Sequence, residues 1–160
     1  MKYIPTLILV LVGTFAWAQG LPNVTLKDLQ GKSVNLSDYN TKSNPVIVSF
    51  WATWCAPCVK ELKAIHKQYP QWQNEFAAEF IAVATDDAKT KNRVKAQVKG
   101  AGWAYTVLMD DNHELKRAMN VTNVPYTVII HNGKIAYVHS GYTPGIENEI
   151  HKELQSLTRN

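Results

Sequence analysis

The only two cysteines of the chain, Cys55 and Cys58, lie within the short run of residues 54–58. Two thiols at this spacing can close a reversible disulfide, and a thiolate among them can attack the disulfide of another molecule. So small a loop removes little entropy from the unfolded chain, which makes a purely stabilising crosslink a poor explanation. Nor do the residues form a four-ligand zinc site, because no further cysteine exists and the five histidines lack ligand spacing. The residues favour a redox-active dithiol.

The segments on either side of the cysteines predict a strand followed directly by a helix. Residues 45–51 form an apolar, β-branched run typical of a buried strand, and residues 59–68 repeat apolar side chains at helical spacing. Cys55 would then lie at the start of the helix, where unpaired amides and the helix dipole stabilise a thiolate. Pro57 suits the first helical turn. We therefore expect Cys55 to be the attacking sulfur and Cys58, one turn further and more covered, the resolving thiol.

The cysteine motif and the segments before it resemble a known family. Trp-Cys-Ala-Pro-Cys (54–58) after an apolar strand is similar to the active site of the thioredoxin superfamily. The stretch 24–39, followed by 44–55, resembles the extracytoplasmic TlpA/ResA-like thiol–disulfide oxidoreductases of bacteria. The resemblance runs from about Leu21 to the C-terminus and is weaker after Asp87.

The remaining sequence predicts an α/β fold with a mixed central sheet flanked by helices. The turn at residues 30–32 predicts an N-terminal β-hairpin, and Pro70 predicts a break in the helix after the cysteines, with a restart over 71–78. Further strands are expected at 79–84, 105–109, 126–130 and 135–139, and further helices at 89–100, 113–119 and 144–157. The resemblance implies that this is a thioredoxin fold and that helix 89–100 is an insertion.

Residues 1–18 have the pattern of a secretory signal peptide. Lys2 supplies the positive start, residues 7–12 the apolar centre, and Ala-Trp-Ala (16–18) a small–x–small cleavage site. We therefore expect one thioredoxin-like domain over 19–160 in the periplasm. The alternative is an uncleaved segment that tethers the protein to the membrane, as in some members of the resembled family.

The resemblance also implies which residues contact a partner. Pro125 stands at the position of a cis-proline that faces the cysteine pair, the alternative being a trans proline that starts an edge strand. The backbone of Val124 would pair with an extended partner segment. Trp54, Ala56 and Pro57 would complete the substrate-binding surface.

A base is needed to deprotonate the resolving thiol. Cytoplasmic thioredoxins carry a buried aspartate six residues before the first cysteine, and Ser49 stands there in this chain. The resemblance implies instead a carboxylate after the next strand, which predicts Asp87, with Asp86 beside it. The alternative is that both aspartates only cap the following helix. Glu61, three residues after Cys58, could tune the cysteines, but a solvated glutamate near a helix start is the commoner situation.

These observations predict an exported thiol–disulfide oxidoreductase that reduces disulfides of extracytoplasmic client proteins. It needs no cofactor beyond its own Cys55–Cys58 disulfide, and it needs a membrane electron donor. Ala56-Pro57 lacks the histidine that would favour an oxidant, which indicates a reductant. The resemblance suggests cytochrome c maturation as one client route. The net charge of +4 is spread along the chain without a basic stripe and stacking aromatics, so no nucleic-acid partner is expected.

Two other functions compete with this prediction. A thiol peroxidase would carry threonine three residues before its reactive cysteine, where this chain has Ala52. A copper-handling protein of the same fold would space its cysteines more widely and add a distal histidine, for which His131 and His139 are available. We expect no metal site.

Overall fold

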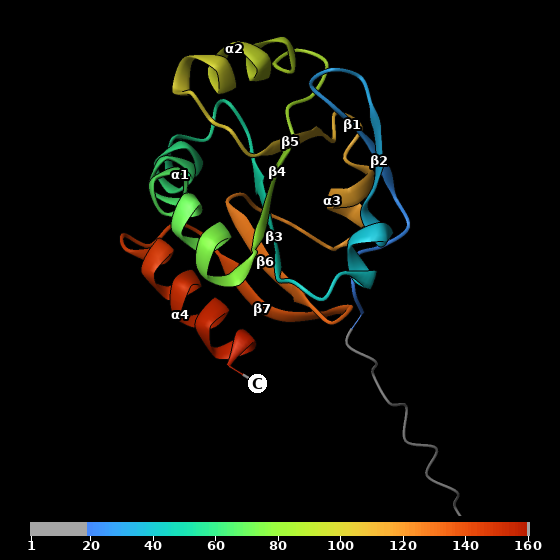
Figure 1. The fold of residues 1–160 in the computed structure, drawn as a ribbon. Helices are drawn as coiled ribbons and strands as arrows, with labels where there is room; N and C mark the ends of the chain where they lie inside the picture. The colour runs from blue at the N-terminus through green and yellow to red at the C-terminus, as the bar shows by residue number, and fades with distance from the viewer. Residues whose placement is uncertain (1–18, 160) are drawn as a thin grey trace, which may run out of the picture.

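The computed structural model describes residues 19–159, which form one seven-stranded sheet with helices on both faces (Figure 1). The predicted signal peptide, 1–18, lies outside the described residues. The strands are β1 (Thr25–Asp28), β2 (Ser33–Asn35), β3 (Val46–Trp51), β4 (Glu79–Ala84), β5 (Thr106–Met109), β6 (Tyr126–His131) and β7 (Lys134–Ser140). The helices are the 3-10 helix η1 (Leu36–Thr41) and the α-helices α1 (Ala56–Phe76), α2 (Asn92–Ala101), α3 (Glu114–Ala118) and α4 (Ile146–Thr158).

The sheet is mixed, as predicted. Its strand order is β2-β1-β5-β4-β3-β6-β7, and β3, β4 and β5 run parallel while the other neighbours run antiparallel. Every residue of β3 is buried, because both of its faces are covered. The carboxyl ends of the three parallel strands meet at one edge of the sheet, so the loops that follow β3 and β4 lie next to each other.

Two apolar cores lie on opposite faces of the sheet. Helices α1, α2 and α4 contribute Ile65, Val94 and Ile150 to the first core, while η1 and α3 contribute Leu36 and Leu115 to the second. Figure 1 shows α1 and α4 side by side on one face. None of the helices within residues 19–159 combines the length and apolar character that a membrane crossing requires.

Helix α1 continues through Pro70, so the predicted break at this residue is wrong. A proline inside a helix removes one backbone hydrogen bond and crowds the preceding turn. Tyr69 and Trp72 extend the buried stripe of α1 past the proline, and Trp72 is fully buried. Packing of these side chains outweighs the local cost, and the helix ends only at Ala77, which adopts a left-handed conformation.

Local hydrogen bonds set the starts of two other helices. Helix α2 begins at Asn92 rather than Lys89, since the carbonyl of Asp87 accepts hydrogen bonds from the amides of Thr90 and Lys91 and closes a turn there. Asn35 caps η1, because its side chain accepts a hydrogen bond from the amide of Ser37.

Candidate active site

Cys55 and Cys58 form a disulfide at the junction of β3 and α1. Cys55 is the N-cap residue of α1, and the amide of Cys58 donates a hydrogen bond to its sulfur at 3.3 Å. Cys58 is fully buried, whereas Cys55 retains 5% of its exposure. The sulfur at the helix start is therefore the less covered of the two, and an amide beside it is of the kind that favours a thiolate.

The segment before β6 brings backbone polar groups to the attacking sulfur. The Val124–Pro125 peptide bond is cis, and the Val124 carbonyl oxygen lies 3.7 Å from Cys55 Sγ. The Pro125 carbonyl accepts a hydrogen bond from the amide of Gly141. Val124 and Pro125, 69 and 70 residues beyond Cys55, thus lie beside the disulfide where the resemblance placed them.

Exposed side chains surround the covered sulfurs. Trp54 is 62% exposed, and Ala56 and Pro57 are also exposed. Trp51, three residues before Trp54, is fully buried and packs edge-on against Trp103. The two tryptophans therefore differ: Trp51 belongs to the core, and Trp54 is free to contact another molecule.

Glu61 is buried with only 1% exposure, so its interpretation as a solvated glutamate is wrong. One carboxylate oxygen lies 2.8 Å from Thr127 Oγ1 and 3.5 Å from Ser49 Oγ, while Oε2 has no hydrogen-bond partner among the described residues. Burial raises the pKa of Glu61 to about 7, against the lowering effect of the two hydroxyl groups. Glu61 lies three positions after Cys58 on α1, a spacing that places the two Cβ atoms about 5–6 Å from each other. The buried carboxylate near the resolving thiol is Glu61.

A signal for this burial was present in the sequence. The buried stripe of α1 passes through Cys58, Leu62 and Ile65. Glu61 lies three residues after Cys58 and four before Ile65, which puts it on the same stripe. Two hydroxyl residues inside otherwise apolar strands, Ser49 and Thr127, supply its partners.

Asp86 and Asp87 differ completely from each other. Asp86 is fully buried and accepts hydrogen bonds from the amide (2.8 Å) and the hydroxyl of Thr53, two residues before Cys55. Asp87 is exposed, and its carboxylate accepts from the amide of Lys89 at 2.9 Å and the hydroxyl of Thr90. The Asp87 carboxylate thus closes a turn ahead of α2, whose N-cap residue Lys91 makes no side-chain cap hydrogen bond, so Asp87 does not cap that helix, and its hydrogen bonds do not include a cysteine. Asp86 holds the active-site loop instead.

Candidate metal ligands do not converge in the described residues. Between 19 and 159, no three His, Cys, Asp or Glu side chains form a group that could hold a metal ion. His139 and His131, considered for copper, pair with Thr127 and Lys134 at opposite ends of β6 and β7.

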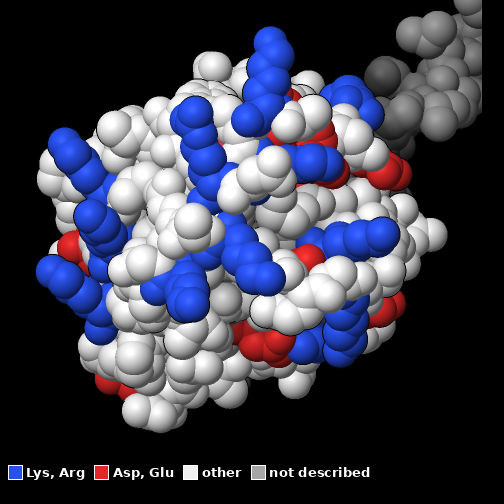
Figure 2. Space-filling view, turned by 90° about the horizontal axis from the view of Figure 1, so that it is seen from above, with Lys and Arg blue, Asp and Glu red and all other residues white. Residues whose placement is uncertain are grey.

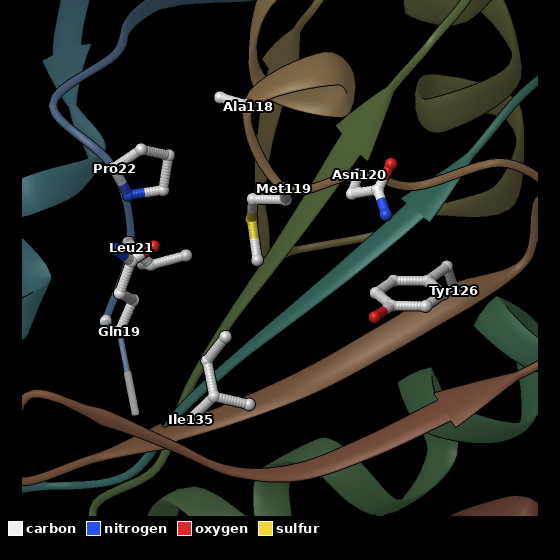
Figure 3. Close-up of a pocket in the computed structure, with 9 residues that line it drawn as sticks. Gln19, Leu21, Pro22, Ala118, Met119, Asn120, Tyr126 and Ile135 are labelled. Atoms are coloured by element: carbon white, nitrogen blue, oxygen red, sulfur yellow. The ribbon is translucent and has the colours of Figure 1, made fainter. Parts of the chain in front are cut away.

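A cavity of about 610 Å³ lies away from the cysteines, on the face covered by η1 and α3 (Figure 3). Residues 19–22, the end of α3, and Met119, Tyr126 and Ile135 line it. No cysteine or carboxylate contributes to its wall, so the redox chemistry of the protein belongs to the other site.

Comparison with known proteins places these features in a family. Residues 18–138 match the AhpC/TSA family. The thiol–disulfide oxidoreductase ResA of Bacillus subtilis is 33% identical over 121 residues, which cover 75% of this chain and 65% of ResA. ResA of Geobacillus thermodenitrificans is 29% identical over 137 residues, covering 85% of this chain and 75% of that protein. The chain thus spans about two thirds of the length of the Bacillus relative.

Solved structures share the whole fold. A thioredoxin-like protein from Porphyromonas gingivalis has 44% identity and a TM-score of 0.76, covering 89% of this chain and 94% of its own. A putative thiol:disulfide interchange protein DsbE from Chlorobium tepidum has the same TM-score at 23% identity, covering 88% and 96%. These likenesses confirm the thioredoxin fold, and the ResA relatives support the TlpA/ResA-like resemblance.

Proposed function

Because the chain belongs to the AhpC/TSA family of thioredoxin-like proteins, we propose that it is an exported thiol–disulfide oxidoreductase that reduces disulfides of extracytoplasmic proteins. The observation that carries this proposal is the site itself. An accessible cysteine at a helix start, a covered second cysteine and a buried carboxylate one turn later supply an attacking thiolate, a resolving thiol and a base.

The first step forms a mixed disulfide. The amide of Cys58, which donates to Cys55 Sγ in the disulfide form, is in place to stabilise the Cys55 thiolate of the reduced protein. That thiolate attacks one sulfur of the client disulfide. A bond forms between Cys55 and that sulfur, and the other client sulfur leaves as a thiolate. The exposed Trp54, Ala56 and Pro57 and the backbone of Val124 hold the client segment.

The second step releases the client. Glu61, with its pKa near 7, accepts the proton of Cys58, and the Cys58 thiolate attacks Cys55. The Cys55–Cys58 disulfide forms, and the second client sulfur leaves as a thiolate. The client gains two electrons that this protein loses, so an external donor, which we place in the membrane, must reduce it again.

The location follows from residues 1–18. Their signal-peptide pattern supports export, and disulfides persist outside the cytoplasm. Apocytochrome c during its maturation is one client that the resemblance suggests.

The test combines a potential with two variants. We expect the Cys55–Cys58 couple to equilibrate in thiol/disulfide buffers at or below about −270 mV, the value of thioredoxin. Cys58→Ser should accumulate a mixed disulfide with an oxidised client peptide, and Cys55→Ser should not. A potential near −120 mV, that of a strong oxidant, would contradict the reductase direction. If the couple does not exchange with thiol/disulfide buffers at all, the proposed oxidoreductase activity is refuted.

A further inference from the structure

Lysine and arginine side chains gather on the face of the molecule above the redox edge of the sheet (Figure 2). Figure 2 looks down on this edge, where β3 and β4 end and α2 lies. Exposed cations of α1 and of the segment around α2 make up what we call the basic face: Lys60, Lys63, Lys67, Lys89, Arg93, Lys95 and Lys99.

The segments that carry the basic face hold few exposed carboxylates of their own. Within residues 52–74 and 85–101, Asp87 is the only exposed acid, because Glu61 and Asp86 are buried. The ion pairs found between residues 19 and 159 are Lys42–Glu79, Lys91–Asp111 and His151–Glu75. None of them includes a cation of the basic face, so its positive potential is available to a partner.

The cations lie on the two segments that follow β3 and β4, on either side of the redox site: α1, and the loop after β4 with α2. Lys60 follows Cys58 by two residues on α1. Lys89 follows Asp86 by three residues, and the Asp86 carboxylate is bonded to Thr53, just before the cysteines. Because β3 and β4 are paired in parallel, both segments start at one edge, and a client segment that reaches Cys55 comes close to both sets of cations.

We propose that the basic face selects client disulfides that are flanked by acidic side chains. This inference deepens the proposed function and rests on it. Carboxylates beside the client disulfide are attracted while the disulfide approaches Cys55, and basic flanks are repelled. Steering by a charged surface changes association rates by about 10- to 10³-fold, and salt suppresses it.

The first measurement compares disulfide-cyclised peptides with glutamate, glutamine or lysine flanks. We expect the reduced protein to reduce the glutamate peptide at least about tenfold faster than the lysine peptide at low salt. Between about 0.01 M and about 1 M salt the Debye length falls from about 30 to about 3 Å, and the preference should largely disappear. Equal rates for the three peptides at low salt would overturn the proposal.

Charge-reversal variants separate the basic face from net charge. The triple variant Lys60→Glu, Lys89→Glu and Arg93→Glu should lose or invert the preference. Its matched control is Lys134→Glu, Lys152→Glu and Arg159→Glu, which makes the same charge change elsewhere. Lys134 follows the β6–β7 turn at the opposite edge of the sheet, and Lys152 and Arg159 lie in and after α4. Equal loss in both triples would show a net-charge effect and overturn the proposal.

An uncharged small disulfide, 2-hydroxyethyl disulfide, reports on the dithiol alone. Both triples should reduce it at the rate of the unaltered protein. If the unaltered protein fails to reduce it, the proposed function itself is refuted, whereas normal reduction without peptide preference refutes only the selectivity. Binding to phosphatidylglycerol vesicles that the first triple abolishes, without any peptide preference, would assign the basic face to a membrane and overturn the proposal.

Discussion

Glu61 lies beside Ser49, which stands at the strand position where cytoplasmic thioredoxins are expected to carry an aspartate. Ser49, at the strand position, lies 3.5 Å from the Glu61 carboxylate, so the helix delivers its acid to the place where the strand provides only a hydroxyl. Thr127 contacts the same carboxylate from β6. In this chain the buried acid is supplied by α1, one turn beyond Cys58, and not by β3.

Replacing Glu61 by glutamine should slow the resolution of the mixed disulfide. Glutamine keeps the shape but cannot accept the Cys58 proton, and general-base catalysis contributes about 10²- to 10⁴-fold. We expect release of a client peptide from Cys55 to slow by about 10²-fold at pH 7, measured by rapid quench. The control is Glu75→Gln on the exposed last turn of α1. Equal release rates for both variants would remove Glu61 from the reaction.

The same variant should change how stability depends on pH. The pKa of Glu61 rises from 4.5 to about 7 on folding, so the folded state holds this proton more tightly. The contribution of protonated Glu61 to the free energy of unfolding is full below about pH 4.5 and is lost as the pH rises through 7. The free energy of unfolding of oxidised Glu61→Gln, measured in urea, should therefore equal that of the unaltered protein at pH 4. At pH 8 it should be higher by up to about 3 kcal/mol. A difference that does not change with pH would contradict the raised pKa.

At the scale of elements, the loop after β4 fixes the loop that carries Cys55. Besides the Asp86–Thr53 contacts, the amide and hydroxyl of Thr85 both donate to the carbonyl of Trp51. These bonds join the ends of two parallel strands, so the start of α1 is held from the neighbouring element.

Asp86→Asn tests this bracing. Thr53 donates one hydrogen bond to each of the two carboxylate oxygens of Asp86, and asparagine has only one oxygen to accept them. Losing a hydrogen bond to a buried charged group costs about 1.5–3 kcal/mol. We expect that loss in urea unfolding, together with faster hydrogen exchange at the Thr53 amide. Asp87→Asn is the matched control and should stay within about 0.5 kcal/mol, because asparagine can accept the same turn hydrogen bond from the Lys89 amide at an exposed position. Similar losses in the two variants would show that Asp86 has no special bracing role.

At the scale of the molecule, one sheet separates two apolar cores, and only one of them contains tryptophan, whose fluorescence reports on unfolding. Trp51, Trp72 and Trp103 all belong to the core under α1 and α2, and the core under η1 and α3 contains no tryptophan. The redox site lies at the edge that both cores support, so its geometry depends on the integrity of both.

The loss of stability caused by Leu36→Ala should therefore be detected by the tryptophans in the core on the other side of the sheet. Leu36 is fully buried in the core without tryptophan, and its truncation should cost about 2–5 kcal/mol. If the cores unfold as one unit, tryptophan fluorescence and far-UV circular dichroism will shift to the same lower midpoint. A fluorescence midpoint that stays unchanged would show that the two cores unfold separately.

The sequence by itself determined the dithiol, the strand before it, the helix start at Cys55 and the order of elements, because these depend on local spacing and periodicity. The turn between the expected strands 126–130 and 135–139 is local in the same sense: it contains Asn132 and Gly133, which both have positive φ. The sequence misjudged Pro70 and the length of α2, where packing of Trp72 and backbone bonds to Asp87 outweigh local preference.

Only the tertiary structure decided which carboxylate is buried one helical turn from Cys58. The sequence does not show which of the acids Glu61, Asp86 and Asp87 is buried. In the structure, side chains of β3 and β6 cover Glu61, and the loop that contains Thr53 covers Asp86. Asp87 is exposed to solvent. Burial depends on segments that are distant along the chain, and burial sets both the pKa and the role of an acid. The basic face has the same origin: lysines that are scattered along the sequence meet at one edge because two parallel strands end there.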